Sequence, residues 1–220
     1  MQLIKGWYLP DSEKHFKGYF EKFSDNSEKA EYQSYQRKIS LAYVKESRIA
    51  IDIGANIGLW ARDICEKFDH VHLFEPYEEN IDCLKKNLSN YNNYSLHSCC
   101  LSNIDKKSKL SIYPDGLGAN TLKPQNESTS QLQIDVSCKR LDYYELNQVD
   151  YIKIDVQYHE LEVIEGSIET LKRNNPVLCI EAARRNQDEL NYVNKFINIL
   201  QSLNYRIVGE AGKKELIFMK

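Results

Sequence analysis

The sequence lacks the features of membrane and secreted proteins. No apolar run approaches the roughly 20 residues that cross a bilayer. A secretory signal would also need an apolar stretch near the start, and the chain carries charged residues there instead: Lys5, Asp11, Glu13 and Lys14. We therefore expect no membrane span and a cytoplasmic location.

An excess of basic charge is also missing. The 29 basic and 32 acidic residues give a net charge of −3, and no basic tract is long enough to follow a phosphate backbone. Nucleic acid is therefore an unlikely partner on charge grounds.

The six cysteines, at positions 65, 83, 99, 100, 138 and 179, form no Cys-x-x-Cys pair. They lie in segments with helical or strand patterns, where thiols usually pack as small apolar groups. We expect reduced thiols and neither a zinc site nor a disulfide framework.

The 220 residues suit one domain that follows an extension at 1–47. From residue 48 to 220, apolar runs alternate with helical patterns, which predicts an α/β domain with a largely parallel sheet. Strands are expected at 48–53, 71–74, 95–101, 149–156 and 177–180. Two closing runs, 205–208 and 215–219, predict an antiparallel hairpin.

Two segments are candidates for an acceptor site. The extension carries residues 7–10 and a predicted helix with an apolar face of Tyr32, Tyr35, Ile39 and Tyr43. This face either packs against the sheet, or Trp7, Tyr8 or Tyr32 covers the active site as a lid. A polar loop at 114–130 is long for a compact domain, which is typical of a binding or mobile segment.

The most informative stretch is 49–58, where an apolar strand ends in a carboxylate and a glycine turn. Its G-x-x-x-G spacing puts Asn56 where a dinucleotide-binding loop has its second glycine. Asp52 would repel a pyrophosphate but favour the positive sulfur and ammonium groups of S-adenosylmethionine. The expected contacts to this cofactor are Asp52, Gly54, Ala55, Asn56 and Gly58.

A second carboxylate ends the next predicted strand. Glu75, followed by Pro76, lies 21 residues after Gly54 and can accept hydrogen bonds from both ribose hydroxyls. The third strand ends at Ser102 and Asn103, which either read the adenine edge or form a turn.

Three blocks of sequence, 51–58, 74–76 and 152–160 with Gly166 beyond, resemble the FkbM family of methyltransferases over residues 48–182. The third block is similar to the family's I-K-I-D-V-x-G-x-E signature. Tyr158 stands where the family usually has glycine, so either this turn tolerates a side chain or Tyr158 projects into the pocket.

The resemblance implies a Rossmann-like class I methyltransferase fold. This is a mostly parallel seven-stranded sheet with a C-terminal antiparallel hairpin and helices on both faces. It also implies that S-adenosylmethionine is the methyl donor and that the reaction is O-methylation.

The catalytic groups are expected at the ends of the fourth and fifth strands. Strand alternation puts Tyr151, Lys153 and Asp155 on one side, where Lys153 and Asp155 should pair with each other, the cofactor or the substrate. Asp155 is the expected base or acceptor-orienting group and also a cofactor contact. His159 could take the proton instead.

Glu181 ends the fifth strand and would lie beside Asp155 if the two strands are neighbours. Two such carboxylates could hold a divalent cation such as Mg²⁺ that binds the acceptor oxygens.

The expected reaction is methylation of a hydroxyl on a small-molecule or glycan acceptor, foremost a sugar of a glycan or glycosylated metabolite. RNA ribose 2'-O-methylation is an alternative that would need a Lys-Asp-Lys-Glu tetrad and a basic groove. A non-catalytic nucleotide-binding module is another, and an NAD-dependent enzyme is disfavoured by the glycine spacing.

Overall fold

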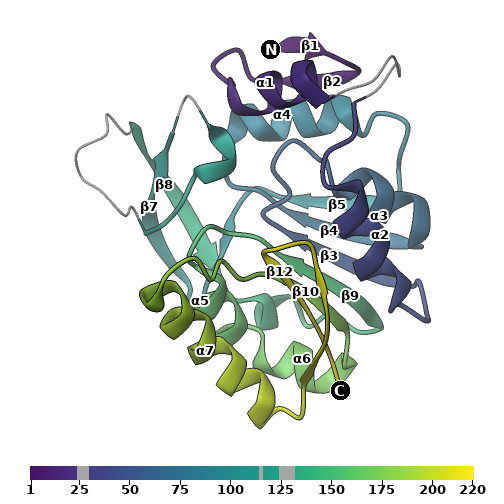
Figure 1. Cartoon of the computed structure of the whole chain (residues 1–220), viewed down its shortest axis with the longest axis vertical. Helices are drawn as coiled ribbons and strands as arrows, with labels where there is room; N and C mark the ends of the chain where they lie inside the picture. Colours follow the sequence, from purple (N-terminus) through teal and green to yellow (C-terminus); the bar gives the residue numbers. More distant parts are fainter. Residues whose placement is uncertain (24–29, 114–115, 124–131) are drawn as a thin grey trace.

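The computed structural model describes residues 1–23, 30–113, 116–123 and 132–220. Its main feature is a seven-stranded sheet with the strand order β11-β12-β10-β9-β3-β4-β5 (Figure 1). The strands are β3 (Ile49–Ile53), β4 (His70–Phe74), β5 (Tyr94–His97), β9 (Val149–Ile154), β10 (Val177–Glu181), β11 (Arg206–Ala211) and β12 (Glu215–Met219).

Strand β12 runs antiparallel to both of its neighbours, β10 and β11. The pairs from β10 through β9, β3 and β4 to β5 are all parallel. The predicted mostly parallel sheet with a closing antiparallel hairpin is therefore confirmed.

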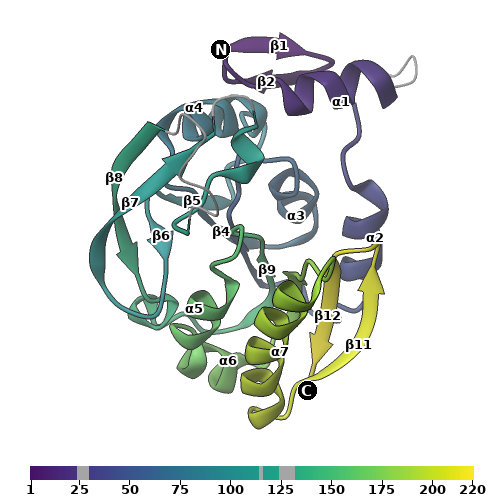
Figure 2. The same ribbon diagram turned by 60° about the vertical axis from the view of Figure 1, so that its left-hand side comes forward.

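Helices cover both faces of this sheet (Figure 2). One face carries α2 (Ser34–Ala42), α3 (Ala61–Lys67) and α4 (Glu78–Asn87), and the other carries α5 (Glu160–Glu165), α6 (Ile168–Asn174) and α7 (Gln187–Ser202). Strand alternation divides the core as predicted, because Tyr151 packs on the α3 side while Ile152 and Ile154 pack on the α5 and α7 side.

A second, three-stranded sheet lies beside the first, with the order β6-β8-β7 (Figure 1). Its strands are β6 (Cys100–Leu101), β7 (Lys106–Ile112) and β8 (Leu132–Lys139). The expected single strand at 95–101 was wrong, because β5 and β6 belong to different sheets. Of the polar loop expected at 114–130, the structure describes 116–123, with a short 3₁₀ helix at Leu117–Ala119, and the rest lies outside the described residues.

The extension forms a hairpin of β1 (Gln2–Ile4) and β2 (Trp7–Leu9), followed by α1 (His15–Phe23). The hairpin packs on α4 (Figure 2). Trp7 is buried against Ile57 and Cys83 of the main domain, and its indole N–H donates to the carbonyl of Ala30 at 2.7 Å.

The predicted apolar face of the extension divides between two environments. Ile39 and Tyr43 pack towards the large sheet, whereas Tyr35 is 65% exposed. Tyr32 precedes α2 and lines the cavity described below. The division of the chain at residue 47 and a lid function for the extension stay predictions.

All six cysteines are free and buried, as expected for packing thiols. They are distributed over four apolar clusters: the α5 and α7 side of the sheet (Cys99), its α3 side (Cys65 and Cys179), the interface with the extension (Cys83) and the small sheet (Cys100 and Cys138). Among the described residues, no helix is both long and apolar enough to cross a bilayer.

Candidate active site

The turn after β3 is held by backbone geometry. Gly54 has a positive φ of 80°, and a Cβ at this position would overlap the carbonyl oxygen of Asp155. The amides of Gly54 and Ala55 both donate to the carbonyl of Phe74, at 3.0 and 3.1 Å. The glycine therefore allows the ends of β3, β4 and β9 to meet.

Gly58 also has a positive φ, of 88°. A Cβ here would make only ordinary contacts, the nearest at 3.4 Å from Leu84, so the backbone conformation rather than crowding favours glycine. Both glycines of the G-x-x-x-G pattern thus have a conformational reason.

The Glu75 carboxyl is fixed at the end of β4 and is only 5% exposed. It accepts hydrogen bonds from the backbone amides of Asn56 at 2.9 Å and Tyr77 at 3.0 Å. Burial raises the pKa of Glu75 to about 7 in spite of these bonds. A carboxyl group held this rigidly can present its remaining lone pairs to a pair of hydroxyls.

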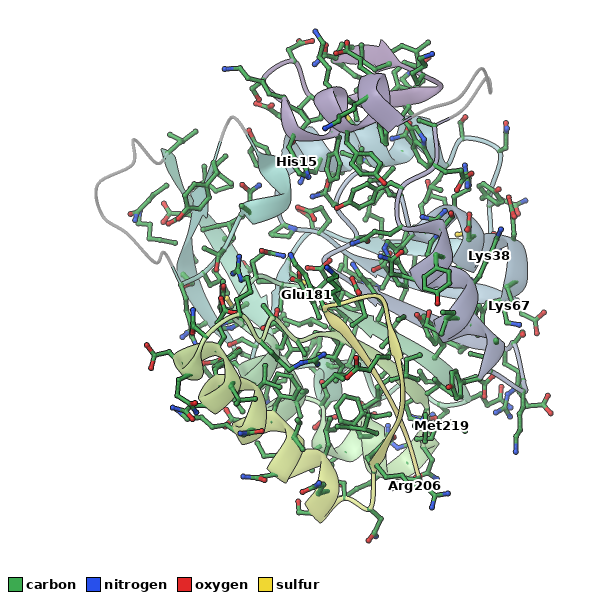
Figure 3. All side chains as sticks on the ribbon, viewed as in Figure 1. His15, Lys38, Lys67, Glu181, Arg206 and Met219 are labelled. Carbon is green, nitrogen blue, oxygen red and sulfur yellow. The ribbon has the colours of Figure 1, made fainter. Side chains whose placement is uncertain are left out.

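A cavity of about 540 Å³ extends from the Gly54 turn and Glu75 to the ends of β9 and β10. This volume lies within the range of roughly 300–1,000 Å³ typical of small-molecule sites. His15 of α1 and Glu181 of β10 line it and mark its two sides in Figure 3. The predicted site residues that line it are Gly54, Ala55, Asn56, Glu75, Pro76, Lys153, Asp155, His159 and Glu181.

Four predicted cofactor contacts, Asp52, Gly58, Ser102 and Asn103, do not line the cavity. Ser102 is buried and its hydroxyl lies 3.0 Å from Nε2 of His159, while the Asn103 amide donates to Glu165 at 2.7 Å. The Ser102 and Asn103 side chains thus already have protein partners. The contact of all four residues with a cofactor stays a prediction.

Asp52 is fully buried on the α3 side of the sheet and pairs with Lys153, whose Nζ lies 3.2 Å from Oδ1 of Asp52. The same ammonium group donates to the carbonyl of Gly54 at 3.0 Å and lies 3.7 Å from Oδ2 of Asp155. Burial alone would lower the pKa of Lys153, but the Asp52 and Asp155 carboxylates raise it. The predicted pairing of Lys153 with Asp155 is confirmed, with Asp52 as a closer partner.

Asp155 and Glu181 lie side by side because β9 and β10 are parallel neighbours. The Gln157 amide bridges them, donating to Oδ1 of Asp155 at 2.8 Å and to Oε2 of Glu181 at 2.7 Å. Burial and the Asp155 charge raise the pKa of Glu181 to about 9. Burial opposes ionisation of Asp155 too, but Lys153 lowers its pKa, so near neutral pH the two carboxyl groups together hold one proton.

The same pair was the expected cation site. Within the described part of the chain, no group of three or more His, Cys, Asp or Glu side chains could hold a metal ion. Gln157 contacts both carboxyl groups, and Nζ of Lys214 lies 3.3 Å from Oε1 of Glu181. These residues therefore do not by themselves form a cation site, and a divalent cation stays a prediction.

His159 lines the cavity, and both of its ring nitrogens face protein groups, with Nε2 3.0 Å from the Ser102 hydroxyl. Its ring is buried, and burial lowers its pKa to about 4. Its Nδ1 lies 3.5 Å from Oε2 of Glu162. The imidazole is therefore neutral near pH 7, and its role as the base stays a prediction.

Tyr158 shows why the family pattern favours glycine here. Gln157 and Tyr158 have positive φ values of 53° and 69°. The Tyr158 hydroxyl donates to Glu189 at 2.8 Å and accepts from Arg185 at 2.5 Å, on the α7 side of the turn. Of the two alternatives, the structure shows that the turn tolerates a side chain, which does not line the large cavity.

Sequence reasoning did not assign several residues that line the cavity: Phe16, Gln33, Thr121, Gln157 and Lys214. Gln157 lies inside the third signature block, so its proximity to Asp155 was a usable signal. Phe16, Gln33 and Thr121 lie in the two segments that the sequence named as candidates for the acceptor site, although it did not single out these residues.

The sequence model of a protein family, the methyltransferase FkbM domain, matches residues 52–207 of this chain. This chain belongs to the FkbM methyltransferase family. Over 148 residues it is 27% identical to the hexuronic acid methyltransferase AglP of Haloferax volcanii, covering 64% of this chain and 59% of that protein. It is 26% identical over 162 residues to methyltransferase sdnD of Sordaria araneosa, covering 57% of this chain and 62% of that protein. The chain thus spans about three fifths of the length of these two relatives.

Solved structures of low identity show the same fold. The methyltransferase FkbM from Methylobacillus flagellatus KT superposes with a TM-score of 0.61 at 16% identity, covering 92% of this chain and 50% of that one. The ribosomal protein L11 methylase from Lactobacillus delbrueckii subsp. bulgaricus gives a TM-score of 0.50 at 12% identity, covering 84% and 76%. The Rossmann-like methyltransferase fold implied by the sequence is confirmed.

Proposed function

We propose that this chain is an S-adenosylmethionine-dependent O-methyltransferase that acts on a sugar hydroxyl of a glycan or glycosylated metabolite. The observation that carries the proposal is the Asp155 and Glu181 pair, which faces the same cavity as the Gly54 turn and Glu75. One cavity therefore holds groups suited to a nucleoside and groups suited to a hydroxyl.

The residues fit the donor at two points. Gly54 has no side chain, so its backbone can approach a ligand closely, and Glu75 presents a fixed carboxyl to the ribose hydroxyls. The charges of Asp52 and Lys153 cancel, which leaves Asp155 as the net negative charge of this group. When bound, S-adenosylmethionine supplies an electrophilic methyl group on a positive sulfur, and a negative site favours that charge.

Asp155 is the catalytic residue in this proposal. As the bond from the acceptor oxygen to the methyl carbon forms and the carbon–sulfur bond breaks, the hydroxyl would become strongly acidic, so its proton could move to the Asp155 carboxylate even though Lys153 lowers the pKa of that group. Glu181 and the Gln157 amide hold that carboxylate and orient the acceptor. Proton acceptance of this kind contributes about 10²- to 10⁴-fold to a rate.

The sugar acceptor has narrower support than the reaction type. AglP, one of the family relatives, acts by its name on a hexuronic acid. The RNA alternative would need a basic groove, and the cation nearest the reaction, Lys153, is buried between Asp52 and Asp155. The non-catalytic alternative leaves the charged pair at the cavity without a role.

The first test is calorimetric binding of S-adenosylhomocysteine. Glu75→Gln should weaken binding about 100-fold, because a neutral amide offers one acceptor oxygen instead of two and its NH2 group would face the backbone amide of Asn56 or Tyr77. Glu78→Gln is the matched control, since Glu78 is exposed on the same turn of chain. Equal binding by the Glu75 variant and the wild type would refute the assignment of the ribose site.

The second test is transfer of a tritiated methyl group to a panel of saccharides and to total RNA, with Mg²⁺ or with EDTA. Asp155→Asn should lower transfer at least about 100-fold while S-adenosylhomocysteine affinity stays within about twofold. Labelling of RNA alone would favour the alternative reaction. Loss of transfer in EDTA would support the predicted cation.

A further inference from the structure

We infer that the extension contributes a saccharide subsite to the acceptor side of the cavity, with Phe16 and Tyr32 as the side chains that select a pyranose ring. The inference rests on the proposed function and names residues outside the family match, which begins at residue 52. It makes the extension part of the active site rather than packing alone.

Two aromatic rings of the extension face the cavity. Phe16 of α1 and Tyr32, before α2, both line it. Their rings meet edge to face with centroids 5.1 Å apart, and Tyr19 contacts Tyr32 in the same way at 5.0 Å. Each ring restricts the other, so the aromatic surface is preorganised for a ligand.

Hydrogen bonds hold this surface against the main domain. The indole N–H of Trp60 donates to the Gln33 side chain at 2.7 Å, and the Gln33 amide donates to Glu215 at 3.4 Å. Both Trp60 and Gln33 line the cavity. The chain next to Tyr32 is thereby fixed over the ends of the central strands.

A distant segment closes the other side of the aromatic surface. A Cβ on Gly118 would lie 3.5 Å from Cζ of Phe16, so the 3₁₀ helix Leu117–Ala119 lies against this ring. The Thr121 hydroxyl donates to the carbonyl of Gln157 at 2.6 Å, beside the Asp155 and Glu181 pair. Phe16 therefore lies between Tyr32 of the extension and the segment 117–121, which contacts Gln157 next to the catalytic pair.

The Tyr32 hydroxyl is close enough to Asp155 and Glu181 for their charges to act on it. Burial, then the charges of Asp155 and Glu181, raise its pKa well above the usual range. The hydroxyl thus stays neutral and can donate a hydrogen bond on the side of the cavity where the acceptor must react.

The mixture of groups fits a sugar ring better than other acceptors. A pyranose has an apolar C–H face, which suits Phe16 and Tyr32, and a rim of hydroxyls, which suits amide and carboxyl groups such as Gln33, Gln157 and Glu181. A wholly apolar acceptor would exclude water from these polar groups and offer them no hydrogen bond beyond those they make within the protein. A nucleic acid strand would need several cations, and Lys214 already pairs with Glu181.

Saturation-transfer NMR on protein saturated with S-adenosylhomocysteine tests this subsite without requiring turnover. The probes are methyl β-D-glucopyranoside and methyl β-D-glucuronide, with cyclohexanol as a non-sugar control. In the wild type, saturation should reach the ring C–H protons of at least one glycoside. Phe16→Leu and Tyr32→Leu should each weaken glycoside affinity about tenfold, the value of one aromatic contact.

Tyr35→Leu is the matched control, because Tyr35 is exposed and lies close to Tyr32 in the chain. Unchanged S-adenosylhomocysteine affinity in all three variants shows that the fold survives. Glycoside binding that is absent from the wild type, or equal in the Phe16 and Tyr32 variants, overturns the subsite while leaving methyl transfer intact. Failure of S-adenosylhomocysteine to bind the wild type instead overturns the proposed function.

Discussion

The two ends of the cavity are built by different means. At the cofactor end, backbone groups fix the geometry, since the amides of Gly54 and Ala55 bind the Phe74 carbonyl and backbone amides hold Glu75. At the acceptor end, side chains from distant segments meet, as in the bonds that join Thr121 and Glu181 to the Gln157 residue. A site made from backbone tolerates few changes, whereas a site made from side chains can change its specificity by substitution.

Lys153 contacts both ends, so its removal should have the largest effect. Lys153→Met would leave the buried Asp52 carboxylate without its partner and destabilise the fold by about 4 kcal/mol. Chemical denaturation measures this loss, and Asp52→Asn in the same chain should restore part of it.

Lys109→Met is the control for that variant, because the Lys109 and Asp135 pair is exposed. Its denaturation midpoint should match the wild type. Equal stability of the Lys153 and Lys109 variants would mean that the two ends do not depend on the buried pair.

Gly54→Ala tests the backbone end directly. The added Cβ would overlap the Asp155 carbonyl and occupy a left-handed conformation, which should cost about 3 kcal/mol and lower the melting temperature by about 10 °C. Gly18→Ala is the matched control, since a Cβ there meets nothing within 4 Å and alanine favours a helix. A Gly54 variant as stable as the Gly18 variant would contradict the backbone account.

Glu160 tests the charge repulsion next to the acceptor end, where its carboxyl accepts from the Val156 amide at 3.2 Å without lining the cavity. Burial, with the Asp155 charge, raises its pKa to about 7, so its stabilising contribution is fully present below about pH 4.5 and is lost as the pH rises through 7. Between pH 5.5 and 8 the wild type should lose about 2 kcal/mol more stability than Glu160→Gln. Parallel curves for the two proteins in denaturation series would show that Glu160 does not titrate in this window.

The smallest effect is expected at the contact between Thr121 and Gln157. Thr121→Val keeps the shape but removes the hydroxyl donor, a change of about 1 kcal/mol. The KM for the acceptor should rise about fivefold, and S-adenosylhomocysteine affinity should not change. A change in S-adenosylhomocysteine affinity as large as the change in KM would break the separation between the two ends.

The sequence predicted the strand ends that line the cavity because local patterns determine them. The apolar runs of β3 and β9 and the glycine turn at Gly54 all come from short stretches, and parallel strand order then brings Asp155 beside Glu181. For Asp52 the sequence predicted a cofactor contact but not its pairing with Lys153. Its partner, Lys153, is a polar residue in the neighbouring apolar strand at the paired position, and that shared register was a usable signal.

The acceptor end was harder to predict because tertiary contacts assemble it. Helix α1 was not expected, since Gly18 weakens its helical pattern and its apolar residues pack against Trp7 and Tyr32, which lie outside the helix. Strand β8 was missed because much of it is exposed and polar residues interrupt its apolar pattern. The extension and the loop at 114–130 were both named as candidates for the acceptor site, but no local pattern shows that Phe16 and Thr121 are the residues that face the cavity.

The buried cysteines give this molecule a set of internal reporters. Because the six thiols are distributed over four apolar clusters, a thiol reagent reaches each one only when the layer around it opens. The labelling rate of Cys83 reads how often the extension lifts from α4, that of Cys138 reads the small sheet, and that of Cys179 reads the central strands. Thiol labelling of the native chain therefore measures the rate of local unfolding separately in each of these regions, with no engineered probe.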